Sequence, residues 1–158
     1  MIKKILIVLL LFSGCAFAYS QETPTIETVF GVVGKQKGSV MIELAKDVLG
    51  GHTRITRYRS LIAKADSITL SVILQVLENE TEGGRTLMES KKNGRLEIGS
   101  YLLKNSGNEA NEYLLYSLKS NKITFIYLRG SIPPDELESE LDKLKNLFIK
   151  VNNKTIKL

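Results

Sequence analysis

The sequence predicts a single α+β domain, an antiparallel sheet of about four to five strands with helices packed mainly on one face. Two observations predict it. Strand-like segments joined by short polar turns follow one another over 95–130, and segments with helical apolar periodicity lie before and after them. The chain has 158 residues with no repeat or linker, which indicates one domain over 21–158.

Residues 1–20 read as a secretory signal. A short basic start that includes Lys3 and Lys4 precedes an apolar run over 5–12 and then small residues. This run is too short to span a bilayer, which takes about 20 residues, and no later stretch is long and apolar enough. At the other end, the polar residues 152–158 are expected to form a frayed tail.

The leader has two possible processing sites. Small residues at Ala16, Ala18 and Ser20 suit simple cleavage before Gln21, and this is the favoured alternative. Residues 12–15 resemble a lipobox, which would instead leave a lipid anchor on Cys15. Because Cys15 is the only cysteine, simple cleavage leaves a mature protein without any thiol.

The first elements of the mature chain alternate between helix and strand. Thr23 and Pro24 suit a helix start, and an apolar stripe extends the helix over 24–34. A short strand is expected over 39–44, then one or two helical turns, then a second strand over 54–62, which alternates and is rich in β-branched and aromatic residues.

Residues 67–92 leave two alternatives open. The favoured one is two helices, over 67–79 and 81–92, the second ending at Asn93 and Gly94 as a left-handed cap. The other is a strand followed by a hairpin whose turn is formed by the same Asn93 and Gly94.

The last part of the chain is clearer. Strands are expected over 95–104, 112–119 and 122–130, followed by a closing helix over 134–151 with a single apolar seam. Acidic residues crowd the first half of that helix and lysines the second, which suits the helix dipole. The carboxylates of 135–142 are expected to form a solvated helix face.

Few residues of this chain suit catalysis. His52 is the only histidine, so no histidine-based metal centre is expected, and no G-x-S-x-G or Ser-x-x-Lys motif occurs. The formal charge of +5 falls to +3 once Lys3 and Lys4 are removed with the signal, which is too small to indicate a nucleic-acid partner. We therefore expect no enzyme activity, cofactor or metal.

The candidate anion-binding residues are His52, Arg54, Arg57 and Arg59, because guanidinium groups pair well with planar anions. Strand alternation places Arg54 on the face opposite Arg57 and Arg59, so convergence is not automatic. The plainer interpretation is a set of exposed basic residues that protects a strand edge.

Two further sets of candidates remain. Aromatic side chains on the predicted meander could face a partner or pack within the sheet, and they are Tyr101, Tyr113, Tyr116, Phe125 and Tyr127. Asp66-Ser67-Ile68 resembles the motif that is O-glycosylated on exported Bacteroidetes proteins, so Ser67 is a candidate glycosylation site.

Motif order carries a family resemblance over roughly 25–150. The motifs are Phe30-Gly-x-x-Gly-Lys-Gln-Lys-Gly38, Val40-Met-Ile-Glu-Leu44, Tyr58-Arg-Ser-Leu61 and Phe125-Ile-Tyr-Leu-Arg-Gly130. Together they resemble small exported Bacteroidetes proteins classed as a domain of unknown function. The resemblance implies a compact α+β domain of the bacterial envelope and assigns no catalytic residue.

The expected function is a non-enzymatic binding or structural module of the periplasm or extracellular space. Its partner would be an envelope protein or polysaccharide, and a retained Cys15 would make it an outer-membrane lipoprotein. One alternative is a small-ligand carrier with a pocket between sheet and helices and Arg57 or Arg59 at its mouth. Another is an inhibitor or accessory of an envelope enzyme.

Overall fold

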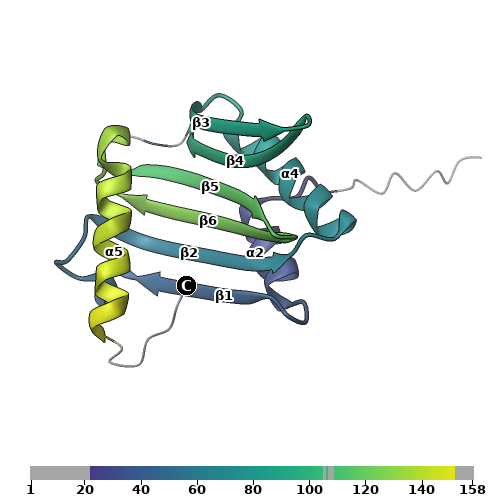
Figure 1. The fold of residues 1–158 in the computed structure, drawn as a ribbon. Helices are drawn as coiled ribbons and strands as arrows, with labels where there is room; N and C mark the ends of the chain where they lie inside the picture. Colours follow the sequence, from purple (N-terminus) through teal and green to yellow (C-terminus); the bar gives the residue numbers. More distant parts are fainter. Residues whose placement is uncertain (1–21, 105, 107–108, 152–158) are drawn as a thin grey trace, which may run out of the picture.

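The computed structural model describes residues 22–104, 106 and 109–151, and the side chains as far as 146. The expected signal, both processing alternatives with Cys15, and the tail 152–158 lie outside the described residues. At the centre is one antiparallel sheet of six strands (Figure 1). Across the sheet their order is β1 (Val40–Ala45), β2 (Ile55–Lys64), β6 (Lys122–Gly130), β5 (Asn111–Lys119), β4 (Arg95–Leu102) and β3 (Arg85–Lys92).

Four α-helices and two short 3₁₀ helices accompany the sheet in the described part of the chain. They are α2 (Ile26–Val32), η1 (Val33–Lys35), α3 (Lys46–Leu49), α4 (Ser67–Thr81), η2 (Pro134–Glu136) and α5 (Leu137–Val151). The predicted α+β class and antiparallel sheet are confirmed, but the sheet has six strands rather than four to five.

The additional strand comes from residues that the sequence analysis assigned to a second helix. The predicted first helix is confirmed as α4, which begins where the Asp66 carboxylate accepts from the Thr69 N–H at 2.8 Å. The predicted helix over 81–92 is wrong, because that segment forms β3 and pairs with β4. Asn93 and Gly94, with φ of 52° and 74°, form the hairpin turn of the other alternative.

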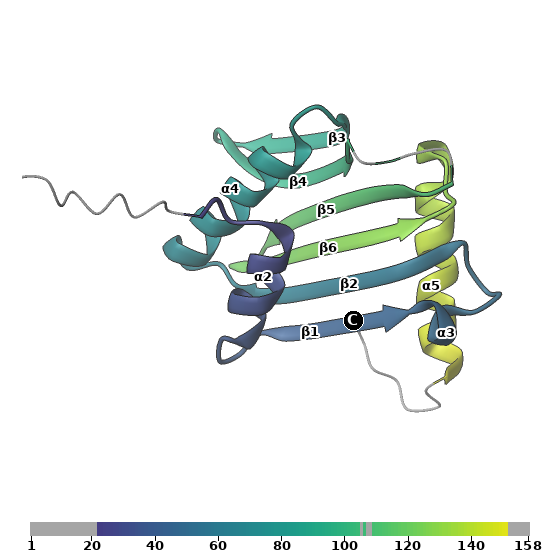
Figure 2. The same cartoon turned by 180° about the vertical axis from the view of Figure 1, so that it is seen from behind.

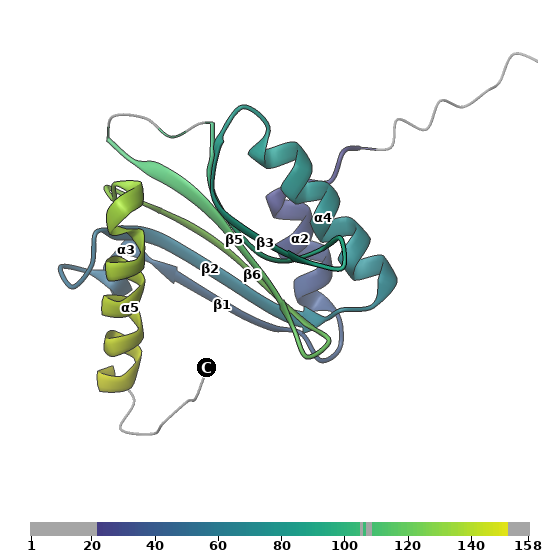
Figure 3. The same ribbon diagram turned by 45° about the horizontal axis from the view of Figure 1, so that its top comes forward.

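The helices lie on opposite faces of the sheet. Figure 2 shows α2 and α4 over one end of the strands, on what we call the α4 face, and Figure 3 shows α5 crossing the opposite face, the α5 face, at the other end. The prediction that the closing helix shares a face with the others is therefore wrong. The apolar seam of the closing helix shows that the helix must pack against the sheet, but it does not indicate on which face.

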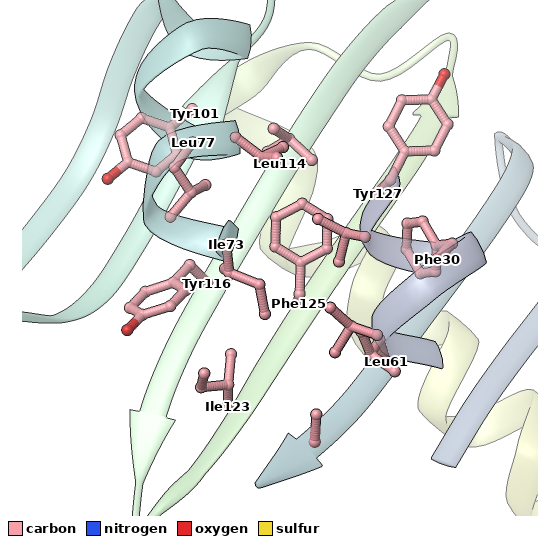
Figure 4. Close-up of a cluster of buried hydrophobic side chains, with 14 of the residues drawn as sticks. Phe30, Leu61, Ile73, Leu77, Tyr101, Leu114, Tyr116, Ile123, Phe125 and Tyr127 are labelled. Carbon is pink, nitrogen blue, oxygen red and sulfur yellow. The ribbon is translucent and has the colours of Figure 1, made fainter. Parts of the chain in front are cut away.

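The larger core lies between the sheet and the helices α2 and α4 (Figure 4). Phe30 and Phe125 form its aromatic centre, with ring centroids 5.7 Å apart. Ile73 and Leu77 reach it from α4. Burial of large side chains on this scale is the main stabilising contribution to such a domain.

A second core lies under α5. Leu137 and Leu144 of the helix pack with Tyr58, Tyr113 and Leu128 of the sheet. The Tyr113 hydroxyl is buried and donates to the Ile132 carbonyl at 2.5 Å, at the start of the segment that leads into α5. This bond and the apolar contacts together hold the helix across the strand ends.

Gly130 is required where β6 meets the start of β2, and Gly31 offers a matched control. A Cβ at Gly130 would lie 2.3 Å from the Arg54 carbonyl oxygen, whereas one at Gly31 would meet nothing within 4 Å. We expect Gly130→Ala to lower the free energy of unfolding by about 1–3 kcal/mol. Gly31→Ala, inside α2, should raise it by about 0.5–1 kcal/mol. Urea unfolding of both variants measures this, and a cost at Gly31 equal to that at Gly130 would contradict it.

Candidate functional site

Arg54, the first of the candidate anion-binding residues, is tied to the closing helix. Its backbone N–H donates to Glu140 at 2.9 Å and its Nε donates to the same carboxylate at 3.2 Å, while its guanidinium also pairs with Glu136. Lys143 adds a third donor to Glu140 at 2.6 Å, and the Glu140 side chain is fully buried. This carboxylate belongs to the run that was expected to be solvated, and for Glu140 that expectation is wrong.

The environment of Glu140 explains its charge state. Burial by itself would raise its pKa, but the hydrogen bonds from Lys143 and Arg54 outweigh that effect and hold the pKa below its ordinary value. The carboxylate is therefore ionised at neutral pH and links the start of β2 to α5.

Arg57 and Arg59 lie on the α4 face, each beside a carboxylate. Arg57 contacts Glu43 at 3.5 Å and lies over the Tyr127 ring, with 5.9 Å from its guanidinium carbon to the ring centroid. Arg59 is 8% exposed and donates to Glu27 at 2.7 Å. Ion pairs within the protein thus occupy both guanidinium groups.

Arg59 also lies over the Phe30 ring at 4.1 Å, and His52 is exposed in the turn before β2. The structure does not bring the four candidate residues to one site. Arg57 and Arg59 share Glu43, whereas Arg54 is paired on α5. Their arrangement favours structural ion pairs over an anion site.

All the candidate aromatic side chains are buried. Tyr101, Tyr116, Phe125 and Tyr127 belong to the core under α2 and α4, and Tyr113 lies under α5. None is more than 8% exposed. A partner-facing role for them is not supported, because α2 and α4 on one face and α5 on the other cover the positions that alternation alone left open.

We expect the buried tyrosines to resist ionisation. Burial is the largest cause that raises the pKa of Tyr58, Tyr101, Tyr113, Tyr116 and Tyr127, and that of Tyr127 reaches about 12. Since these pKa values are raised in the folded state, their stabilisation is complete below pH 10 and is lost as pH rises through the folded values. An absorbance titration should therefore show less phenolate at pH 10 than free tyrosine gives, and a cooperative rise on alkaline unfolding. Ordinary titration at pH 10 in folded protein would contradict this.

Ser67 is exposed at the first turn of α4, immediately after the cap residue Asp66. The hydrogen bond from the Thr69 backbone lowers the pKa of Asp66 and accounts for an aspartate at this position. Glycosylation of Ser67 stays a prediction, and its exposure leaves the hydroxyl accessible.

A groove of about 620 Å³ opens to solvent between α4 and the β3–β4 hairpin. Side chains of both characters line it, including Leu74, Leu77, Glu89, Arg95 and Tyr101. This is where a sheet–helix pocket exists, but neither Arg57 nor Arg59 lines it. This groove therefore does not have those arginines at its mouth.

Within the ranges that the structure describes, no three His, Cys, Asp or Glu side chains are grouped so that they could hold a metal ion. No helix in those same ranges has the length and apolar character needed to cross a membrane.

Each face of the sheet has one end without a helix, and the two ends differ in character. On the α4 face the uncovered end carries charge: Arg57 is opposite Arg129 in the register, and Arg129 is opposite Glu112. The Glu112 carboxylate accepts from the Tyr127 hydroxyl. Because its side chains are charged or hydrogen-bonded, this end of the sheet can face water without a covering helix.

The uncovered end of the α5 face is apolar instead. In Figure 1 it is the part of the sheet beside α5 that no helix crosses. Its aliphatic side chains, which we call the open strip, are Val40, Ile42, Ile62, Met88, Ile98, Leu115 and Ile126. Val40, Met88 and Ile98 are 55%, 53% and 42% exposed.

The open strip consists of two adjacent rows that run across all six strands. The row nearer α5 comprises Ile42, Ser60, Ile126, Leu115, Ser100 and Met88. The second row comprises Val40, Ile62, Thr124, Ser117, Ile98 and Ser90. The polar members are small hydroxyl residues, so neither row contains a charged side chain.

A row of lysines borders the open strip on the side away from α5. Lys64 is opposite Lys122, and Lys122 is opposite Lys119, so three cations lie side by side on neighbouring strands. All three are exposed, and none lies within 4 Å of a carboxylate that the structure describes. Like charges placed directly across strands are unfavourable, so this row costs stability.

The sequence carries one signal for the open strip, which the candidate residues did not include. Residues 113–116 and 125–128 are apolar without interruption, so they carry apolar side chains on both faces of the sheet. Strands of this kind require cover on both faces. The helix α5 covers only one end of the second face, and the open strip is what it leaves.

The fold and this surface define a class of protein: a small α+β domain with a six-stranded antiparallel sheet and an accessible apolar sheet face. The model of a family of unknown function, DUF6108, matches residues 13–141, and the chain belongs to that family. This confirms the coarser part of the resemblance, a domain of unknown function. A Bacteroidetes source and export are still predictions.

No curated protein matches the chain. Among solved structures, it is similar to the crystal structure of PA94, a protein of unknown function from Pseudomonas aeruginosa. The identity is 10%, the match covers 78% of this chain and 85% of that one, and the TM-score is 0.36. A likeness at this score is too weak to establish a shared fold.

Proposed function

We propose that this protein is a non-enzymatic binding module of the bacterial envelope and that the open strip binds a protein partner. The observation that carries the proposal is the contrast between the two uncovered ends of the sheet. Water faces charged residues at one of them, and aliphatic side chains interspersed with small hydroxyl residues at the other. A contiguous exposed apolar patch with a polar rim is typical of an interaction site.

The open strip continues the core under α5. Ile42, Leu115 and Ile126 pack against that core with one side and are partly exposed on the other. A partner seated on the strip would therefore complete an existing apolar layer. Its affinity would come mainly from apolar area removed from water.

Photo-crosslinking in the native host tests this proposal. A photoreactive phenylalanine analogue is placed at Ile98 in the open strip and, as a matched control, at Arg129 on the charged end of the other face. We expect one discrete adduct from position 98 and none from position 129. Equal crosslinking from both positions, or none from position 98, would exclude the strip as the binding surface.

The groove beside α4 supports a second candidate, the small-ligand carrier. Its volume of about 620 Å³ suits a small molecule, and Arg95 offers a cation at its wall. Native mass spectrometry of protein from its host would show a bound small molecule in that case. A mass equal to that of the bare chain would set the carrier aside.

A further inference from the structure

We propose that the open strip accepts an amphipathic α-helix of a partner protein, whose acidic flank pairs with Lys64, Lys119 and Lys122. This inference rests on the proposed function and adds the chemistry of the partner. Three features of the molecule support it: the dimensions of the strip, its charge, and its poor fit to a second copy of this chain.

The dimensions of the strip match one helix. Six strands at a spacing of about 4.8 Å give a length of about 24 Å across the sheet, which is about 16 residues of α-helix. Along β6, Leu128 lies under α5 and Lys122 in the lysine row, six residues or about 20 Å apart. After allowance for half the width of α5, the remaining space fits one further helix of about 10–12 Å in diameter.

The lysines beside the strip indicate the charge that one flank of the bound helix must carry. The three lysines line one long side, unpaired with any carboxylate that the structure describes within 4 Å. A helix lying between α5 and this row would bring one flank against the lysines. Carboxylates on that flank would relieve the repulsion within the row, whereas lysines there would add to it.

A second copy of this chain fits less well. Another copy could not lay its sheet flat on the strip, because α5 stands on the same face (Figure 3). Inserting its own α5 would present a polar surface, since Glu138, Asp142 and Lys145 are exposed on that helix. A partner helix with an apolar stripe avoids both conflicts.

Designed peptides provide the probe. One is a helix of about 16 residues with leucines at i, i+3, i+4 and i+7 and glutamates along one flank, and the other carries lysines in place of the glutamates. We measure their binding to the purified mature chain by fluorescence anisotropy and their helicity by circular dichroism. The acidic peptide is expected to bind saturably and to gain helix on binding, and the basic peptide to bind more weakly.

Charge reversal in the protein is the decisive variant. The triple variant, which combines Lys64→Glu, Lys119→Glu and Lys122→Glu, should bind the acidic peptide about tenfold more weakly and the basic peptide more tightly. The control reverses three exposed lysines elsewhere, with the same change in net charge, at Lys35, Lys37 and Lys46. An equal effect of the control would overturn the proposal, as would bound peptide without helix.

The two proposals fail in different ways. If position 98 forms crosslinks in the host but neither peptide binds, the strip still binds a protein partner, and the inference that this partner contributes a helix is wrong. An extended peptide that binds more tightly than the helical one would reject the helix as the occupant of the strip. Saturable, lysine-dependent binding of the acidic helix supports the inference independently of the crosslinks.

Discussion

Replacing Glu140 by alanine is expected to lower the free energy of unfolding by about 2–4 kcal/mol. The carboxylate is fully buried and accepts from the Arg54 backbone, the Arg54 guanidinium and Lys143. Its removal leaves the Arg54 N–H without an acceptor and detaches α5 from the start of β2. Urea unfolding of purified protein measures the change.

Glu138 supplies the matched control for that substitution. It is exposed in the first turn of the same helix, so Glu138→Ala should cost less than about 0.5 kcal/mol. If the two substitutions had equal effects, the helix dipole alone would account for both, and the proposed link between β2 and α5 would be wrong.

The same carboxylate predicts a pH dependence. Because the folded pKa of Glu140 is depressed, its stabilisation is complete above its unfolded value of about 4.5 and is lost as pH falls through the folded pKa. The stability difference between wild type and Glu140→Gln should therefore be largest near neutral pH and shrink below about pH 4.5. A difference that stayed constant down to pH 3 would contradict an ionised, hydrogen-bonded Glu140.

The second large effect concerns binding. Ile98→Asp is expected to reduce co-purification of the native partner at least tenfold, because it places a charge within the open strip. The folded protein should lose no more than about 1 kcal/mol of stability, since Ile98 is 42% exposed. Quantitative mass spectrometry of the co-purified material and urea unfolding give the two values.

Val32 is the control for this substitution. It is 60% exposed, also aliphatic and β-branched, and lies on α2, away from the strip. Val32→Asp should leave the partner bound. Retention of the partner by Ile98→Asp, or its loss from both variants, would show that the strip does not determine binding.

Where local chemistry decided the structure, the sequence was sufficient. Strand β6 has the bounds that alternation predicts, 122–130. The turn before it is a tight hairpin turn, in which Ser120 and Asn121 take φ of 51° and 60°. The predicted strand over 54–62 and the closing helix over 134–151 also correspond to β2 and to η2 with α5.

Tertiary context decided the rest. Residues 85–92 are largely exposed and polar, so their own pattern did not identify a strand, and pairing with β4 made them one. The seam of α5 predicted a helix but not the face that it covers. Glu140 occupies a position where an acidic residue suits the helix start, and only the approach of Arg54 shows that it is buried.

The candidate site was the least predictable part. The basic and aromatic residues that suggested a binding site instead form ion pairs and part of the hydrophobic core. Both are common structural roles for these residue types. The open strip consists of ordinary aliphatic side chains, and their exposure depends on where α5 ends rather than on their own identity. No local pattern contains that information.

Methionine footprinting tests the central claim most directly, that the open strip is covered by a partner in the cell. Met88 lies in the strip and is 53% exposed, while Met41 lies on the α4 face and is 45% exposed. Brief peroxide treatment followed by peptide mass spectrometry compares the oxidation of the two sulfurs in the native host and in purified protein. We predict similar rates in the purified protein and a several-fold slower oxidation of Met88, but not Met41, in the host. The same ratio of rates in both samples would contradict a covered strip.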